Sequence, residues 1–207
     1  MATDQLGKAD RLLMLADLYR KQEKYAEAEP LYLQALSIHE REVAADHPRM
    51  ATSLNALAFL YHKQRKYAEA EPLYQRVLAI RERQFGSNHL ETAISLNNLA
   101  VCYLDQGKLT AAEPLLRRVL AIREQLLESN HLDLATSLNN LGVFYHKQKN
   151  YAEAEALYQR ALVIREQQLG PHHADTVFVL KNLTDCYEAQ GKMAEAEALL
   201  VRSLERD

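Results

Sequence analysis

The sequence predicts an all-α protein in which pairs of helices repeat along the chain and form a solenoid. Three observations support this fold class. Alanine, leucine, glutamate, glutamine, lysine and arginine, which are strong helix formers, dominate the 207 residues. Only 6 glycines and 5 prolines interrupt them, which is few for a chain rich in strands. The sequence also repeats with a period of 42 residues, and a repeat of this length indicates a stack of similar units.

The repeat is visible in histidines at one position of each unit and in tyrosines at three. The histidines are His47, His89, His131 and His173. The tyrosine columns are Tyr19, Tyr61, Tyr103, Tyr145 and Tyr187, then Tyr25, Tyr67 and Tyr151, then Tyr32, Tyr74 and Tyr158. Because these columns contain all 11 tyrosines, we interpret the tyrosines as packing residues of the repeat and not as catalytic groups.

The first helix of each repeat, helix A, is predicted over about residues 50–64 in the second repeat. Leu54, Leu57, Ala58 and Tyr61 follow the i, i+3, i+4, i+7 spacing of one helix face. The short polar turn KQRK ends this helix, and the matching turns DQGK and AQGK place Gly107 and Gly191 where a helix end favours a positive φ.

The second helix, helix B, is predicted over about residues 67–85 in the same repeat. Ala70, Tyr74 and Val77 form its apolar stripe, and Gly86 follows its last residue. The same pattern, moved by 42 residues, predicts the other helix pairs. We expect one domain over residues 1–207, with repeats at approximately 5–46, 47–88, 89–130, 131–172 and 173–207.

The repeat resembles the tetratricopeptide (TPR) signature, in which a small residue follows leucine in helix A and small and aromatic residues alternate in helix B. The residues that carry the resemblance are Leu57, Ala58, Tyr61, Ala70, Tyr74 and Val77. The 42-residue period and the segments LNNLA, YAEAEPLY and AIRE are similar to the kinesin light chain type of TPR, which prokaryotic proteins also carry. The resemblance implies five helix pairs in a right-handed superhelix whose concave groove is lined by A helices.

Composition excludes several classes of protein. A net charge of −3 provides no general basic surface for nucleic acid. No apolar run approaches the roughly 18 residues that span a bilayer, and the first residues, MATDQLGKAD, lack the apolar segment of a signal peptide. The two cysteines do not form a disulfide framework. We therefore expect a cytoplasmic protein, or an internal piece of a larger one, without nucleic acid or membrane partners.

The groups that could carry chemistry have structural interpretations. Equivalent histidines of successive repeats lie too far apart to share a metal, so we expect them to shape the loop that enters helix A. Cys102 and Cys186 share one position of helix A and are expected to be buried. The adjacent charged columns, Glu40, Glu82, Glu124 and Glu166 beside His39, Arg81, Arg123 and Arg165, are interpreted as a solvated helix face. We expect no catalysis, no cofactor and no metal.

Helix A also carries polar residues away from the stripe that packs on helix B. A helical projection of the fourth repeat places Asn139, Asn140 and Val143 on the side that faces the groove. The resulting candidate peptide-binding residues are two polar columns, an apolar floor and a basic edge. They are Asn55, Asn97, Asn139 and Lys181; Asn98, Asn140 and Asn182; Phe59, Val101 and Val143; and His62, Lys63, His146 and Lys147.

The asparagines have two interpretations that the sequence leaves open. Their amides donate and accept hydrogen bonds, so a column of them can bind the backbone of an extended peptide. They can also bond the neighbouring A helix and stabilise the stacking of repeats. The resemblance to kinesin light chains implies a cargo peptide that carries an aromatic residue among acids. Asp17, Asp105, Asp185 and Glu188 weaken that implication because they dilute the positive charge of the basic edge.

Three functions are compared. The first is a non-catalytic scaffold that binds an extended protein or peptide segment, with acidic and apolar residues, in the groove. The second is a structural or regulatory segment of a larger signalling or effector protein, acting by intramolecular docking or weak end-to-end self-association. It is suggested by Leu199, Leu200 and Leu204 in a last helix without a polar cap. The third, a clamp for a terminal carboxylate, fits poorly because Asp185 lies one turn from Lys181.

Overall fold

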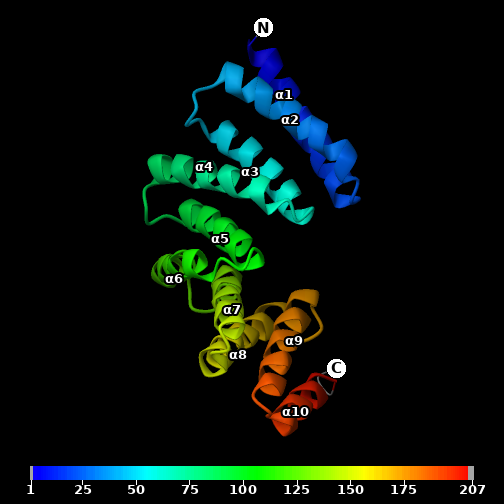
Figure 1. Cartoon of the computed structure of the whole chain (residues 1–207), viewed down its shortest axis with the longest axis vertical. Coiled ribbons are helices and arrows are strands. Elements are labelled where there is room, and N and C mark those ends of the chain that lie inside the picture. Colours follow the sequence, from blue (N-terminus) through cyan, green and yellow to red (C-terminus); the bar gives the residue numbers. More distant parts are fainter. Residues whose placement is uncertain (1, 205–207) are drawn as a thin grey trace. The chain divides into compact units, whose positions relative to one another are not determined.

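The computed structural model describes residues 2–204, and within them the chain forms ten α-helices and no strand (Figure 1). Odd-numbered helices are the predicted A helices and even-numbered ones the B helices, so the all-α fold of five helix pairs is confirmed. The helices are α1 (Ala2–Lys21), α2 (Tyr25–Glu42), α3 (Pro48–Lys63), α4 (Tyr67–Phe85), α5 (Leu90–Asp105), α6 (Leu109–Leu126), α7 (Leu132–Lys147), α8 (Tyr151–Leu169), α9 (Ala174–Ala189) and α10 (Met193–Leu204).

The turns between A and B helices need one residue in the left-handed conformation. Gly107 and Gly191 occupy this position with φ of 73° and 76°, as their sequence context predicts. Glu23, Arg65 and Lys149 occupy it in the other three repeats with φ of 60°. The turn geometry is therefore the same in every repeat, although only two repeats use glycine for it.

Each of the four spaced histidines caps the N-terminus of an A helix. The Nδ1 atoms of His47, His89, His131 and His173 accept the backbone N–H two residues further on, at 3.0 or 3.1 Å. This bond satisfies one of the N–H groups that a helix start leaves without an internal partner. The predicted role of these histidines in the loop that enters helix A is thus confirmed. In the described part of the chain no group of three or more His, Cys, Asp or Glu residues could hold a metal ion.

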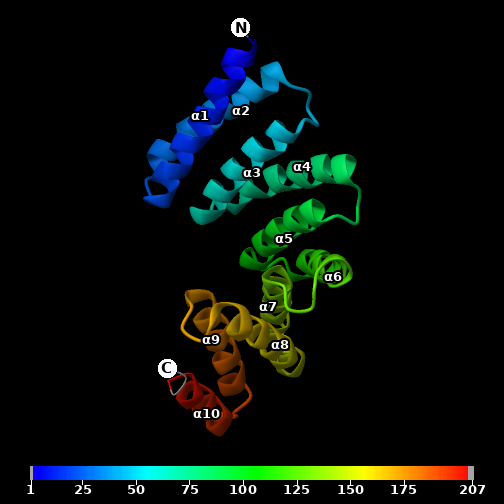
Figure 2. The same cartoon turned by 180° about the vertical axis from the view of Figure 1, so that it is seen from behind.

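The chain divides into two compact units, residues 1–107 with α1–α5 and residues 108–207, whose described part holds α6–α10. Within each unit consecutive helices pack on one another, which can be followed from both sides in Figures 1 and 2. Tyr32, Leu54 and Leu60 lie in the core of the first unit, and Leu138 and Tyr158 in that of the second. The assignment of the chain to one domain stays a prediction.

Two of the tyrosine columns show how repeats are joined. Tyr32, Tyr74 and Tyr158 of the B helices are completely buried, as packing residues should be. The tyrosines of the A helices instead donate or accept at the preceding B helix. Tyr103 and Tyr187 accept from the amides of Gln75 and Gln159 at 3.0 and 2.9 Å, Tyr145 accepts from Arg117 at 2.9 Å, and Tyr61 donates to Glu29 at 3.2 Å.

The prediction that the column of His39, Arg81, Arg123 and Arg165 is solvated was wrong. His39 is 0 % exposed, Arg123 is 4 % and Arg165 is 9 %. These side chains lie at the C-terminal part of a B helix and reach the start of the A helix that follows. The His39 ring bonds the Ser53 hydroxyl at 2.7 Å, and Arg123 donates to the carbonyl of Asp133 and the hydroxyl of Ser137 at 2.8 and 2.9 Å. The column therefore joins repeats.

The acidic column beside it also joins repeats. Glu40, Glu124 and Glu166 pair with arginines of the next B helix, 36 residues further on. The partners are Arg76 at 3.8 Å, Arg160 at 3.0 Å and Arg202 at 3.1 Å. The pairs of Glu40 and Glu124 are exposed and are worth little individually, whereas Glu166 is half-buried.

Candidate peptide-binding face

The predicted asparagine columns bond to one another across neighbouring A helices. Asn98 of α5 donates its amide to the side-chain oxygen of Asn55 on α3 at 3.1 Å. Asn182 of α9 donates in the same way to Asn139 on α7 at 2.8 Å. Each bond joins the second column of one repeat to the first column of the repeat before it. The stacking role that the sequence left open is therefore realised in both units.

These bonds leave part of each amide available. Asn55, Asn98 and Asn182 are half-buried, whereas Asn139 is 4 % exposed. Each of these bonds uses one N–H of the donor amide and the oxygen of the acceptor amide. The donor amide keeps its other N–H and its oxygen, and the acceptor amide keeps both N–H groups, for further hydrogen bonds. Asn97 and Asn140 are also half-buried. Contact of these columns with a ligand stays a prediction, and Asn139 is the member with the least surface for it.

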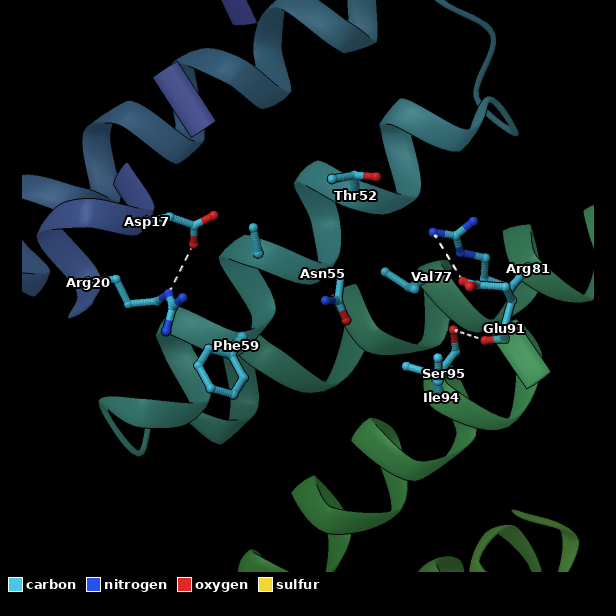
Figure 3. Close-up of a pocket in the computed structure, with 11 residues that line it drawn as sticks. Asp17, Arg20, Thr52, Asn55, Phe59, Val77, Arg81, Glu91, Ile94 and Ser95 are labelled. Carbon is cyan, nitrogen blue, oxygen red and sulfur yellow. Dashed lines mark hydrogen bonds and ion pairs between the residues drawn. The ribbon is translucent and has the colours of Figure 1, made fainter. Parts of the chain in front are cut away.

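In the first unit the predicted residues Asn55 and Phe59 line a pocket between α1, α3 and α5, with a volume of about 330 Å³ (Figure 3). The Arg20 guanidinium lies 5.0 Å from the centre of the Phe59 ring, and the Lys63 ammonium lies 5.3 Å from it. Both distances suit a cation–π contact. Ile94 adds an exposed apolar side chain on α5. The pocket lining thus combines the Phe59 ring and the Asn55 amide with two guanidinium groups, of Arg20 and Arg81, and two carboxylates, of Asp17 and Glu91, while Lys63 lies beside the ring outside the lining.

Arg20 is held in place by an internal network. Its Nε donates to Asp17 at 3.1 Å and to the Tyr32 hydroxyl at 3.3 Å, while Tyr32 donates to Asp17 at 2.6 Å. Burial opposes the charge of the guanidinium, but its bonds to Tyr32 and Asp17 outweigh burial and raise the pKa of Arg20. Burial, followed by the bond to Asp17, raises the pKa of the Tyr32 hydroxyl. Asp17 therefore neutralises a neighbour and does not act as a separate acid of the pocket.

The predicted basic edge differs between the units. His62 of α3 bonds Asp105 of α5 through Nε2 at 2.8 Å, and its ring packs at 5.5 Å from the ring of Tyr67. Its equivalent in the fourth repeat, His146, packs in the same way at 5.3 Å from Tyr151. The residue of α9 that is equivalent to Asp105 is Ala189, which cannot pair with a histidine.

A second pocket, of about 250 Å³, lies beside His146 in the second unit. It is lined by the predicted residues Val143, His146, Lys147 and Asn182, together with Tyr158 from helix B. Lys147 and Lys181 are exposed and make no ion pair within residues 2–204. The two pockets share one position of the repeat, because Val143 of the second corresponds to Phe59 of the first, and each also has an asparagine of the predicted columns in its lining.

The helical projection missed the pocket residues that do not come from the groove side of helix A. Val77 and Arg81 of α4 and Tyr158 of α8 reach the pockets from B helices. Tyr158 reaches through because Gly142 has no side chain at that point of α7. A small residue opposite a large helix-B residue is the signal that could have identified it. Val101, which the projection placed on the floor, is half-buried on α5.

Within residues 2–204 no helix is both long and apolar enough to cross a membrane. A family model described as Tetratricopeptide repeat matches residues 9–83, 49–125 and 126–207. No curated protein matches the chain.

Several solved structures are similar to the whole chain. A Podospora anserina protein described as a kinesin light chain with nearly identical TPR-like repeats is 27% identical, and the match covers 96% of this chain and 94% of that one, with a TM-score of 0.81. BtubC (BKLC) from P. vanneervenii is also 27% identical over 98% and 86% of the two chains, with a TM-score of 0.79. A Rap protein complexed with competence and sporulation factor shares the fold at 19% identity, with a TM-score of 0.78 over 96% and 54%. The resemblance to TPR arrays of the kinesin light chain type is confirmed.

Proposed function

The chain belongs to the tetratricopeptide repeat family, and from this premise we propose that it is a scaffold that binds an extended peptide on the face shared by its A helices. Proteins with these repeats are typically non-catalytic interaction modules. The observation that carries the proposal is that residues of the predicted columns line a pocket in each unit, Asn55 and Phe59 in the first and Val143, His146, Lys147 and Asn182 in the second.

Charge favours a ligand with acidic and apolar residues. Asp17 and Asp105, which the sequence suggested would dilute the positive charge, are bonded to Arg20 and His62. Lys63 and Lys147 keep their charge without an ion pair in the described part of the chain. Acidic side chains of a ligand would pair with these lysines, and its apolar side chains would enter the pockets beside Phe59 and Val143.

We also propose that the chain has no catalytic activity of its own. Burial raises the pKa of the Tyr74 and Tyr158 hydroxyls and of the Cys186 thiol, so these groups stay protonated and are poor nucleophiles. The four repeated histidines use Nδ1 to cap helices. Cys102 and Cys186 are buried and are not joined in a disulfide, which is consistent with the reducing cytoplasm that we propose as the location.

A binding experiment tests the peptide proposal. The probe is a fluorescein-labelled peptide in which leucine and glutamate alternate, with a central proline that prevents pairing between copies. We expect it to bind the chain, and we expect the Lys63→Ala/Lys147→Ala variant to bind it at least tenfold more weakly, a loss of about 1.4 kcal/mol. The measurement is fluorescence anisotropy at low salt.

Two controls make the result specific. The Arg83→Ala/Arg160→Ala variant also removes two exposed positive charges, but from B helices, and should bind with unchanged affinity. A peptide with lysine in place of glutamate should bind poorly. If the Lys63→Ala/Lys147→Ala variant and the unmodified chain bind the acidic peptide with equal affinity, the A-helix face is ruled out as its site.

A further inference from the structure

One glutamate accepts two hydrogen bonds at the junction between α8 and α9. Glu155 of the B helix accepts from the amide of Gln190 at 2.8 Å and from the ammonium of Lys192 at 2.6 Å. One turn further along α8, Gln159 donates to the Tyr187 hydroxyl at 2.9 Å. These bonds, with the cation–π contact of Lys192 with Tyr187 at 5.7 Å, fix the end of the A helix on the B helix before it.

The same contacts recur at the junctions of the first unit. Glu29 of α2 accepts from the Tyr61 hydroxyl at 3.2 Å and from Lys66 at 3.3 Å. Glu71 of α4 accepts from the Gln106 amide at 3.0 Å. At each of these three junctions the glutamate of the B helix therefore bonds one or two of the tyrosine, glutamine and lysine at the end of the next A helix.

Helix α10 presents the B-helix half of this junction. Glu197, Val201 and Leu204 stand 42 residues after Glu155, Gln159 and Leu162 and share one helix face at i, i+4, i+7 spacing. Leu162 is 3 % exposed, whereas Leu204 is 76 % exposed and Val201 is 45 %. Glu197 is exposed and has no ion pair or side-chain hydrogen bond among residues 2–204. We name Glu197, Val201 and Leu204 the α10 face.

Helix α1 and its following turn present the A-helix half. Leu15, Leu18, Tyr19, Gln22 and Lys24 stand 168 residues before Leu183, Cys186, Tyr187, Gln190 and Lys192 of the α8–α9 junction. We name these five residues the α1 face. Leu18 is 51 % exposed and Leu15 is 40 %, although their equivalents Cys186 and Leu183 are 0 % and 1 % exposed.

We infer that a second copy of this chain docks head-to-tail, with the α1 face of one copy on the α10 face of its partner. The junction between copies would repeat the contacts of the α8–α9 junction, with Glu197 accepting from the partner subunit's Gln22 and Lys24. Leu204 would be covered by the partner subunit's Leu15 and Leu18. This self-association goes beyond the proposed peptide binding and uses none of the pocket residues.

Charge selects the head-to-tail arrangement over symmetric ones. The α10 face holds no cation that could pair with a second Glu197, and the α1 face holds no carboxylate that could pair with a second Lys24. Only the contact of unlike faces places Lys24 opposite Glu197. Such a contact is heterologous, so each bound copy leaves one α1 face and one α10 face free for further copies.

The test measures the mass of the intact chain in solution by sedimentation velocity over a range of concentrations. The unmodified chain should show a weight-average mass that rises with concentration above that of one chain. Leu18→Glu on the α1 face and Leu204→Glu on the α10 face should each abolish this rise. A mixture of these two variants should form a dimer and nothing larger, because it contains one intact pair of faces.

Matched variants control for charge and for folding. Val163→Glu adds the same charge at an exposed position of α8, 52 % exposed, and should associate like the unmodified chain. Lys24→Glu and Glu197→Lys should each weaken association at least tenfold, and the chain that carries both should recover it. Far-UV circular dichroism checks that the variants remain helical.

A chain that is monomeric at every concentration, or association that survives both Leu18→Glu and Leu204→Glu, would overturn the inference. So would a mixture of the two variants that stays monomeric. Peptide binding by Lys63 and Lys147 is measured separately and does not depend on any of these substitutions, so the two proposals fail independently.

Discussion

Gly142 shows how a single residue sets the distance between two helices. A Cβ at this position of α7 would lie 2.6 Å from Cε1 of Tyr158 on α8, closer than real Cβ contacts. The repeat before it has Ala100 and Leu116 at the equivalent positions, and the first two repeats combine an alanine, Ala16 or Ala58, with a tyrosine, so the close approach is particular to the fourth repeat. The glycine therefore accommodates the tyrosine ring, which lines the pocket of the second unit.

Replacing Gly142 by alanine tests this close approach. Helix propensity alone would stabilise the variant by about 1 kcal/mol. Overpacking against Tyr158 should cost about 1–3 kcal/mol, so we expect a net loss of stability, measured as a lower urea midpoint. Gly142→Ala/Tyr158→Leu, which copies the residues of positions 100 and 116, should recover much of the loss. A Gly142→Ala variant more stable than the original chain would show that the ring moves without cost.

Residue type alone predicted some positions well and others badly. The tyrosines of the B helices and the two cysteines are buried as expected, because apolar or aromatic residues on the packing face of a helix have little choice of environment. Arg123 and Arg165 were placed in solvent because their charge normally keeps such residues exposed. Their burial depends on partners that only the folded structure brings to them: a carbonyl and a hydroxyl of the next A helix for Arg123, and the Thr136 hydroxyl of the preceding A helix for Arg165.

At the scale of helices, the B helices α2, α4, α6 and α8 each carry a basic residue that contacts the start of the A helix after it. Arg81 lies 3.8 Å from Glu91, and Arg165 lies 3.2 Å from Asp175. At the first junction both members change, because His39 replaces the arginine and Arg49 replaces the acid. Burial lowers the pKa of His39, Asp10 opposes this, and the Arg49 charge lowers it further, so the neutral ring suits its arginine neighbour.

Truncating the buried arginine of this column should be costly. Arg123→Ala removes two hydrogen bonds between α6 and α7 and leaves a cavity, and we expect a loss of about 2–4 kcal/mol. Burial already lowers the pKa of Arg123, against the charge of Asp133, which shows that its site is poorly solvated. The free energy of unfolding from urea denaturation is the measurement.

Arg160 on α8 provides the comparison. It makes an equally short ion pair with Glu124, at 3.0 Å, but its side chain is 55% exposed. Arg160→Ala should therefore cost less than about 1 kcal/mol. Equal losses for Arg123→Ala and Arg160→Ala would mean that burial of the column contributes nothing to stability.

Helix positions were predictable to within two residues in the second repeat, because their signals are local. Helix A was expected over about 50–64 and is found at Pro48–Lys63, and helix B was expected and found at 67–85. The apolar spacing, the polar turn and Gly86 suffice for this. The contacts between A and B helices of different repeats were not predictable, since they join residues about 28–37 positions apart, and the helical projection of one repeat does not show which residues of its neighbour they meet.

At the scale of the whole chain, contacts run between neighbours in sequence. In both units each helix packs on the next, and α1 with α3 and α7 with α9 also touch. In such arrays stability is approximately a sum of repeat and junction contributions. A local substitution should therefore weaken nearby helices without weakening distant ones.

Hydrogen exchange can measure this locality. In the Arg123→Ala variant, we expect backbone amides of α6 and α7 to exchange faster. The largest acceleration should equal the factor by which the loss of free energy of unfolding raises the population of the open state. Amides of α1 and α2 should keep their original rates, because no contact of theirs involves the altered junction. A uniform acceleration along the chain would show instead that it unfolds as a single cooperative unit.

The candidate site was predictable in its columns but not in its pockets. The 42-residue period aligned Asn55, Asn98, Asn139 and Asn182 before any contact was known. The pocket of the second unit is also lined by Tyr158, a B-helix residue that lies close to Gly142 of helix A. This contact depends on the geometry between helices, which the period does not specify.

The matched basic and acidic residues at the junctions also limit which rearrangements of the gene the protein would tolerate. Duplicating one whole 42-residue repeat from the middle of the chain, such as residues 89–130, would place Arg123 of the first copy before Glu91 of the second copy. The new junction would then still pair a basic residue with an acid, and the other junctions would stay as before. Moving the first repeat elsewhere would place His39 next to an acid, Glu91 or Asp133, in the following repeat. It could also leave Arg49 of the second repeat next to an arginine in the preceding one. Expansion of the array by recombination is therefore expected to copy the interior repeats and to leave the first repeat in place.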